Sequence, residues 1–434
     1  MKTTTSIGLA AALAFAIGVF GCAPGNDDDG PEDIVEHQDA PADEGVDGEI
    51  DARDDGGGDG GEEIEDGGVE DGDEDDAGLD DGEGGTSDPG RLGVEVEIGD
   101  GQRPSVASDS SGDPHVVFED GGIWYTVGDG TTGSFGAPVR LSDSGNEALI
   151  AIDENDDAHV VWNIGIGTAG RSGWYTNNIG GSWKPAVRTL EVGDFGLERV
   201  MQGRVFKIPG RSEAVAVWAG SGETAVLVAL QDLAGTPTVL RRVAVTHWVP
   251  GLVLDPGGEG FRVVARRRPG TRVTDYDFDM NAGDSFMVTD CVTTGESGWG
   301  VLTADGEVHY TGSPGGTATT EGPAQVWYSN DTRVAAGLPE IRGMVVATDG
   351  GTARTWTGLC VDVHGQAYVT HSSLVDTNAW IAYVRGEELI SVALAAGYDA
   401  PMRASPVCAP AATGGVHVVY HVGRQAYYRT VGLP

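Results

Sequence analysis

Four histidines recur at one position of a repeated pattern, and a histidine beside a carboxylate can accept a proton. An aspartate precedes both His115 and His159 by six residues, and His309 and His417 occupy the same position in later copies. An active site needs one asymmetric group of residues, whereas a residue repeated in four copies serves what the copies share. We therefore expect these histidines to hydrogen-bond across a turn, and the sequence assigns no catalytic residue.

Tryptophan, arginine and glutamate side chains supply a second chemistry, the recognition of sugars. Apolar pyranose faces stack on aromatic rings, and arginine donates paired hydrogen bonds to carboxylates. Candidates at the start of each repeat are Arg103, Glu147, Arg199, Trp248, Trp299, Trp356 and Arg403. Loops between second and third strands add Glu119, Asp120, Arg171, Arg266, Arg267, Arg268, Arg272, His371, Asp376, His421 and Arg424. The alternatives are a solvated arginine loop and tryptophans that pack between repeats.

Strings that mark known catalytic mechanisms are missing. The sequence contains no H-E-x-x-H, G-x-S-x-G, C-x-x-C or Walker loop. Asp71, Asp73 and Asp75 have the spacing that opens a calcium loop, but Asp76 stands at its glycine position. We predict no metal and no cofactor, and an enzyme is the less favoured interpretation.

Cysteines offer one candidate cross-link. Cys360 and Cys408 stand 8 and 9 residues before Tyr368 and His417, which are matching positions of the last two repeats. These positions allow the two thiols to be neighbours, so a disulfide between them is possible in an oxidising compartment. The three cysteines after Cys22 permit three single pairings, and we expect Cys291 to stay free.

The repeats decide the fold. The pattern D-x-x-G-x-x-H-V-V recurs at steps of 44 to 59 residues, with its seven copies centred on positions 115, 159, 215, 261, 309, 368 and 417. About 50 residues suffice for four short strands and their turns, the size of one β-propeller blade. The sequence predicts an all-β, seven-bladed β-propeller over residues 91–434. Six blades, with one degenerate unit miscounted, is the alternative.

The last repeat ends after its third strand, residues 426–430. The missing strand is expected at the other end of the domain, where residues 94–98 alternate between apolar and acidic side chains. Val94, Val96 and Ile98 should then bury one face against the last blade. This N-terminal strand would close the ring and remove its open edges.

The repeat resembles those of the sialidase-like and BNR-type propeller proteins, a group that includes secreted polysaccharide lyases and uncharacterised lipoproteins. The resemblance covers residues 93–434 and implies architecture more than chemistry. No sialidase Asp-box is present, because the nearest string, Ser329-Asn330-Asp331, is followed by Arg333 where glycine belongs. The propeller lyases use His and Tyr to abstract a proton, so the resemblance also implies a lyase as an alternative function.

The N-terminus carries an export signal. Lys2 precedes an apolar run over residues 7–20, which is shorter than the roughly 20 residues of a membrane-spanning helix. The run ends in Val19-Phe20-Gly21-Cys22, which resembles a bacterial lipoprotein signal. We expect residues 1–21 to be removed and Cys22 to be lipidated, with the protein anchored outside the cytoplasm at the outer membrane or cell surface. An ordinary cleaved signal is the alternative.

Residues 22–90 hold 29 acidic residues and one base, Arg53. Such a segment has almost nothing apolar to bury, so the sequence predicts a disordered acidic linker. The whole chain has a net charge of −42, which excludes nucleic acid as a probable class of partner.

The interpretation we favour is a membrane-anchored lipoprotein whose propeller binds a glycan or a protein. Its first alternative is a polysaccharide lyase or glycoside hydrolase acting on acidic glycans, and its second is a structural envelope protein.

Overall fold

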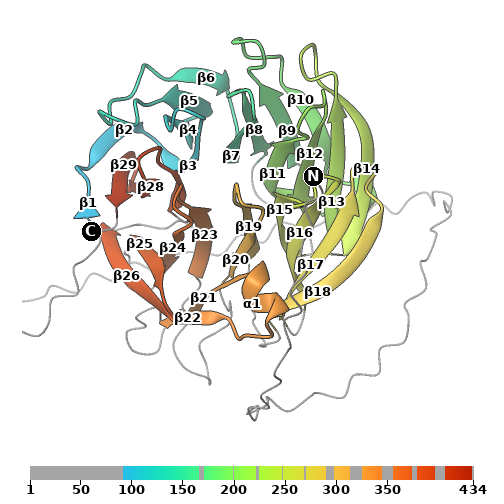
Figure 1. Cartoon of the computed structure of the whole chain (residues 1–434). Coiled ribbons are helices and arrows are strands. Elements are labelled where there is room, and N and C mark those ends of the chain that lie inside the picture. The colour runs from blue at the N-terminus through green and yellow to red at the C-terminus, as the bar shows by residue number, and fades with distance from the viewer. Residues whose placement is uncertain are drawn as a thin grey trace, which may run out of the picture. The chain divides into compact units, whose positions relative to one another are not determined.

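Seven antiparallel sheets follow one another around a ring in the computed structural model (Figure 1). The structure describes residues 91–165, 171–198, 200–220, 224–246, 248–267, 270–289, 298–312, 325–344, 355–373, 379–395 and 406–432. The chain divides into two units, residues 1–80 and 81–434, and the described residues all belong to the second. The expected seven-bladed propeller is confirmed, and the six-bladed alternative is wrong.

The first six blades each contain four strands in chain order. Blade 1 consists of β3 (Gln102–Ser108), β4 (Pro114–Glu119), β5 (Ile123–Val127) and β6 (Val139–Ser142). Blade 2 consists of β7 (Asn146–Ile152), β8 (Ala158–Ile164), β9 (Ser172–Asn177) and β10 (Val187–Glu191). Blade 3 consists of β11 (Met201–Lys207), β12 (Ala214–Ala219), β13 (Thr224–Gln231) and β14 (Thr238–Thr246).

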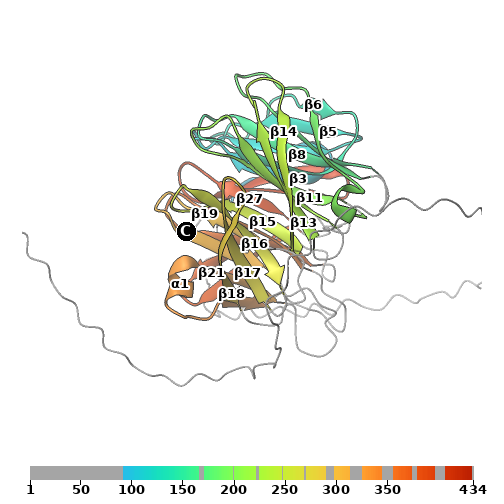
Figure 2. The same ribbon diagram turned by 90° about the vertical axis from the view of Figure 1, so that its right-hand side faces the viewer.

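Blade 4 consists of β15 (Trp248–Leu254), β16 (Gly260–Arg267), β17 (Gly270–Asp277) and β18 (Ala282–Thr289). Blade 5 consists of β19 (Gly298–Leu302), β20 (Val308–Gly312), β21 (Gln325–Asn330) and β22 (Ile341–Met344). Blade 6 consists of β23 (Thr355–Val361), β24 (Ala367–Ser373), β25 (Ala379–Arg385) and β26 (Glu388–Ala395). The helices among the described residues are the short α1 (Asp331–Ala335), which follows β21 (Figure 2), and the 3-10 turn Asp194–Gly196. No helix in the described ranges is long and apolar enough to cross a membrane.

Blade 7 is built from both ends of the domain. It contains β27 (Val407–Pro410), β28 (Val416–Val422) and β29 (Gln425–Gly432), and β1 (Arg91–Leu92) and β2 (Val96–Asp100) both pair with β29. Val96 lies opposite Tyr428, and Asp100 lies opposite Gln425. The predicted closure of the last blade by an N-terminal strand is therefore correct.

One detail of that prediction is wrong, because Val94 is not buried. Its side chain is 84% exposed, whereas Val96 and Ile98 pack against the core between blades 7 and 1. The chain leaves the sheet edge between β1 and β2, and there Glu95 accepts a hydrogen bond from the Tyr420 hydroxyl. Strict alternation along the sequence does not reveal this break in the strand.

The hydrophobic core lies between neighbouring blades. Each sheet is covered on both faces, and the second strand of blade 3 shows this most fully: all six residues of β12 are apolar and buried. Trp218 fills one such seam, where Gly173 and Gly203 leave room for its ring. A Cβ on Gly203 would lie 2.5 Å from that ring, so the position requires glycine.

Polar groups also link the blades. These links lie on the face that carries the turns between first and second strands, which we call the turn face; the opposite side is the loop face. In order from blade 1, the links are Ser110 to Asp156, Lys207 to Glu154, Arg211 to Phe278, Arg262 to Asp331, Arg333 to Glu387, Asp362 to the Gly415 N–H, and His417 to the Gly112 carbonyl. Every seam of the ring is therefore linked on this face.

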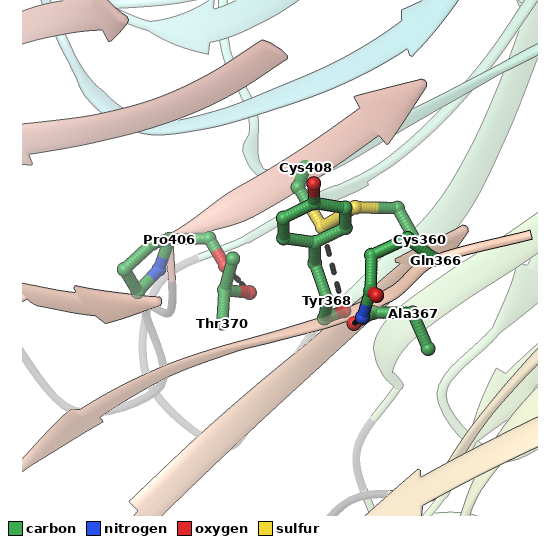
Figure 3. The surroundings of a disulfide bond; sticks show 7 residues. All are labelled: Cys360, Gln366, Ala367, Tyr368, Thr370, Pro406 and Cys408. Carbon is green, nitrogen blue, oxygen red and sulfur yellow. Dashed lines mark hydrogen bonds between the residues drawn. A yellow bond between two sulfur atoms is a disulfide. The ribbon is translucent and has the colours of Figure 1, made fainter. Parts of the chain in front are cut away.

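A disulfide joins blades 6 and 7 (Figure 3). It connects Cys360 of β23 to Cys408 of β27, with 5.7 Å between the Cα atoms. Both side chains are buried beside Tyr368. This is the pair that the sequence indicated, while Cys22 and Cys291 lie outside the described residues.

Candidate functional site

The first strands of four consecutive blades are irregular on the loop face. Their pairing with the second strand shifts register at one point near the start of β3, β7, β11 and β15. Arg103 and Glu147, at equivalent places in the first two, have positive φ angles of 46° and 54°. Such backbone is costly for a residue with a side chain, and bulges of this kind often re-aim side chains beside functional sites.

Polar side chains at and beside these bulges are joined, through two backbone N–H groups, into a continuous chain that we call the rim network. It consists of His421, Arg103, Glu119, Glu147, Asn163 and Arg171. Arg103 forms an ion pair with Glu119 at 3.2 Å. Glu147 accepts a hydrogen bond from the Asn163 amide at 2.7 Å and lies 3.5 Å from the Arg171 guanidinium. The network therefore runs across three blades, 7, 1 and 2.

The same contact recurs at two seams and fixes the bulges. His421 Nδ1 of blade 7 accepts the backbone N–H of Arg103 at 3.3 Å. Glu119, which occupies the position of His421 in blade 1, accepts the backbone N–H of Glu147. In each case the end of a second strand binds the bulge of the next blade, so the unusual backbone is held by a specific acceptor.

Arg204 extends the charged surface into the ring. Its guanidinium lies over the Trp299 ring, with 4.1 Å to the ring centroid. These residues belong to blades 3 and 5, whose first strands are separated by that of blade 4, so the contact is made within the ring. Loss of hydration lowers the pKa of Arg204 to about 10, although the charge of Glu147 opposes this shift. Arg204 therefore stays cationic at neutral pH.

The arginines of this region keep unused donors. Among the described residues, the Nε groups of Arg103, Arg171 and Arg204 are buried and have no hydrogen-bond partner. A buried donor without a partner costs about 1 to 3 kcal/mol. The side chains of Arg103 and Arg171 nevertheless stay 24% and 19% exposed, so their charge remains available to an anionic ligand. The arrangement can thus bind a carboxylate.

Glu119 can exchange a proton near neutral pH. Burial raises the pKa of its carboxyl to about 7, against the opposing effects of Arg103 and of the backbone N–H groups of Glu147 and Ala148. The nearby charge of Glu147 adds to the increase. Glu119 is thus a group whose charge responds to its surroundings.

The repeated histidines lie on the turn face and serve the scaffold. His115 contacts the Tyr125 hydroxyl at 2.7 Å through Nδ1 and the Asp109 carboxylate at 3.3 Å through Nε2. His159 repeats both contacts in blade 2, and His309 and His417 also contact tyrosine hydroxyls. The expected hydrogen bond across the turn is confirmed for His115 and His159, and its extension to a tyrosine of the third strand is new.

His371 does not lie in a loop, as the sequence indicated, but inside β24. It occupies the position of Phe118, Trp162 and Trp218 in other blades, is 2% exposed and stacks on Trp380. Burial lowers the pKa of His371 to about 3, so the ring is neutral. It is an aromatic spacer between blades.

The structure brings together three of the candidate ligand residues. Arg103 and Glu147 meet in the rim network, and Glu147 and Trp299 both approach Arg204. Trp248, Arg267 and Trp356 have their backbones in β15, β16 and β23, but their side chains lie outside the described structure, as does the whole of Arg403. Their role stays a prediction.

Two residues of the site were missed, Asn163 and Arg204. Asn163 shares its repeat position with Glu119, so the repeat alignment itself could have found it. Arg204 gave no such signal, because Ser105 and Leu149 stand at its position in blades 1 and 2. In the ranges that the structure describes, no group of three His, Cys, Asp or Glu side chains is placed to hold a metal ion.

Comparisons with known proteins add little to this picture. No protein-family model and no curated protein matches the sequence. Similar solved structures include a periplasmic gluconolactonase from Pseudomonas aeruginosa, at 15% identity over 79% of this chain and 100% of that chain, with a TM-score of 0.48. The polysaccharide lyase Uly1 matches at 12% identity over 76% and 90%, with a TM-score of 0.43. Likenesses at this level indicate no activity or ligand for this chain.

Proposed function

We propose that this protein is a lipid-anchored, extracytoplasmic binding protein whose propeller takes an acidic saccharide at the rim network and Arg204. The observation that carries the proposal is the guanidinium of Arg204, held on Trp299 inside the ring with a buried Nε that has no partner among the described residues. A fixed, partly dehydrated arginine pairs strongly with a carboxylate.

The surroundings of Arg204 suit a sugar that carries such a carboxylate. Arg171 supplies a second cation, and Glu147 supplies acceptor oxygens for hydroxyl groups. Trp248 and Trp356 begin first strands on the same loop face, which places their backbones toward this end of the ring. Their aromatic faces are the expected stacking surfaces for pyranose rings.

Calorimetric titration of residues 91–434 with trigalacturonate, with neutral maltotriose as the comparison ligand, tests the binding site. We expect trigalacturonate to bind and Arg204→Gln to weaken it by about 10- to 100-fold, the loss of one charge-assisted hydrogen bond. Arg211→Gln, on the turn face, is the matched control and should bind normally. Equal affinity of Arg204→Gln and the unmodified protein would contradict the site.

The anchor is tested separately on the full chain. Cys22→Ser should move the protein from the membrane fraction to the soluble fraction, since it removes the acyl chains that provide the apolar anchor. Unchanged membrane association would contradict lipidation at Cys22.

A lyase or glycoside hydrolase is the second candidate, favoured by Glu119, which exchanges protons near neutrality beside Glu147. A group with such a pKa can act as a general acid or base. Incubation with uronate polymers distinguishes the candidates: new ultraviolet absorbance of unsaturated ends indicates a lyase, and new reducing ends without absorbance indicate a hydrolase. Neither signal is expected if the protein only binds.

A further inference from the structure

We propose that an anionic ligand binds at the rim together with a proton, which Glu119 takes up. The inference rests on the proposed function and adds its regulation by pH. It follows from the packing around Glu119, which places the carboxylate of Glu147 and the three arginines of this region close to it.

Glu119 already uses the nearest cation. Its carboxylate pairs with Arg103 at 3.2 Å and accepts the Glu147 N–H. The carboxylate of Glu147 pairs with Arg171 and lies within electrostatic reach of Arg204. A ligand carboxylate that pairs with Arg171 or Arg204 therefore enters a site where two protein carboxylates already share three arginines.

A third negative charge there favours protonation of the carboxylate that is least stable as an anion. Glu119 is mostly buried and has its pKa raised to about 7 before any ligand arrives. A unit charge about 8 Å away raises a pKa by about one further unit at a dielectric between those of protein and water. Glu119 then carries a proton at a pH where it was ionised in the free protein.

Other titratable groups facing this position are less suited to take the proton. His421, from β28, uses its Nδ1 lone pair to accept the Arg103 N–H, so protonation there would break a hydrogen bond that holds the bulge. Asp120 follows Glu119 but is exposed, and water screens its charge. Arg103, Arg171 and Arg204 are cations already.

The affinity for the anionic ligand should fall as the pH rises. Because the pKa of Glu119 is higher in the complex than in the free protein, affinity is greatest below about pH 7 and falls as the pH rises through the interval between the two values. We expect trigalacturonate to bind about tenfold more weakly at pH 8.5 than at pH 6. The upper pH stays below the pKa of Arg204, about 10, so that the arginine remains charged.

Titration calorimetry at pH 7.5 in phosphate and in Tris measures the protons directly, since the two buffers differ in ionisation enthalpy. We expect an uptake of about half a proton for each ligand bound. Glu119→Gln should remove both the uptake and the pH dependence, while Asp120→Asn, its exposed neighbour, should keep both. The buffer comparison on the unmodified protein tests proton uptake even if Glu119→Gln fails to fold.

Each outcome of these measurements supports or overturns the proton coupling. Binding of trigalacturonate with no buffer dependence would overturn the proton coupling and leave the proposed function intact. Uptake that persists in Glu119→Gln, or disappears in Asp120→Asn as well, would show that Glu119 is not the acceptor and would also overturn it. Absence of binding at every pH would overturn the proposed function and the coupling with it.

Discussion

His115 joins three strands of blade 1 through its two ring nitrogens. It contacts Tyr125 on the third strand and Asp109 at the end of the first. The repeat of this group in blade 2, and the tyrosine contacts of His309 and His417, tie it to the scaffold rather than to a ligand. The loop face, where the bulges lie, carries none of these four groups.

His115→Ala should lower the free energy of unfolding by about 1 to 3 kcal/mol, because it leaves the buried Tyr125 hydroxyl without its partner. Denaturant unfolding measures the change, with the exposed His364→Ala as control. Ligand binding on the loop face should be unaffected. Loss of binding with an intact fold would refute the scaffold role.

His371→Phe should stabilise the protein. Neither ring nitrogen of His371 has a partner among the described residues, so the buried imidazole carries a cost that the phenyl ring found at Phe118 avoids. Burial also lowers the pKa of His371 to about 3 in the folded protein. The unfolded chain therefore binds a proton at this residue first, and the folded state of the unmodified protein loses stability as the pH falls from about 6.5 toward 3.

Denaturant midpoints at pH 7 and pH 5 test this second substitution. The free energy of unfolding of the variant should exceed that of the unmodified protein by about 1 to 3 kcal/mol at pH 7 and by more at pH 5. Comparing the two proteins at each pH cancels the opposite contribution of Glu119, whose raised pKa favours the folded state in acid. An equal difference at both pH values would contradict the titration of His371.

At the scale of elements, only two of the three apolar residues of the predicted closing strand are packed against the core. Val96 and Ile98 pack into the seam between blades 7 and 1, whereas Val94 lies outside the sheet. The closure of the ring thus depends on β2, a strand of five residues, and on the two-residue β1, which also pairs with β29.

Val96→Asp should destabilise the domain by about 2 kcal/mol or more, since it places a charge against Tyr428. Val94→Asp should change stability by less than about 0.5 kcal/mol, because that side chain already faces water. Deletion of residues 93–99 should cost far more than either. Thermal unfolding of the three variants compares them, and equal midpoints would refute the strand closure.

The sequence predicts the strands well and the site only in part, for a physical reason. Alternating apolar residues and turn-forming Asp and Gly act locally, so the positions around His115 already reveal each blade and its order. The contact of Arg204 with Trp299 instead depends on where two non-adjacent blades aim their side chains. No local pattern encodes that meeting, and the same holds for the break in the strand at Val94.

At the scale of the whole molecule, the ring is fastened twice in one region. The disulfide joins β23 to β27 of blades 6 and 7, and β1 and β2 complete blade 7 on its outer side. In the described residues the other seams are held by side-chain packing, by the polar links of the turn face and, between blades 7 and 1 and blades 1 and 2, by the hydrogen bonds of the rim network.

Replacing both cysteines, Cys360→Ala with Cys408→Ala, should lower the free energy of unfolding by about 4 kcal/mol, the chain-entropy value for a separation of 48 residues. Denaturant unfolding without reductant measures it. Cys291→Ala, the cysteine expected to be unpaired, is the control and should unfold like the unmodified protein. A double variant as stable as the control would refute a stabilising disulfide.

The pairing of β2 with β29 also sets an order of events during synthesis. The Asp100 and Gln425 side chains that meet across this pair are 325 residues apart in the chain. A ribosome makes β1 and β2 first among the described strands of the ring, yet both pair with β29 and have no partner until the last residues have emerged. Contacts this distant in the chain form slowly and leave unpaired strand edges in the meantime. We therefore expect blade 7 to be completed late in folding, and we expect the unfinished chain to be most exposed to proteases and to its own copies before that step.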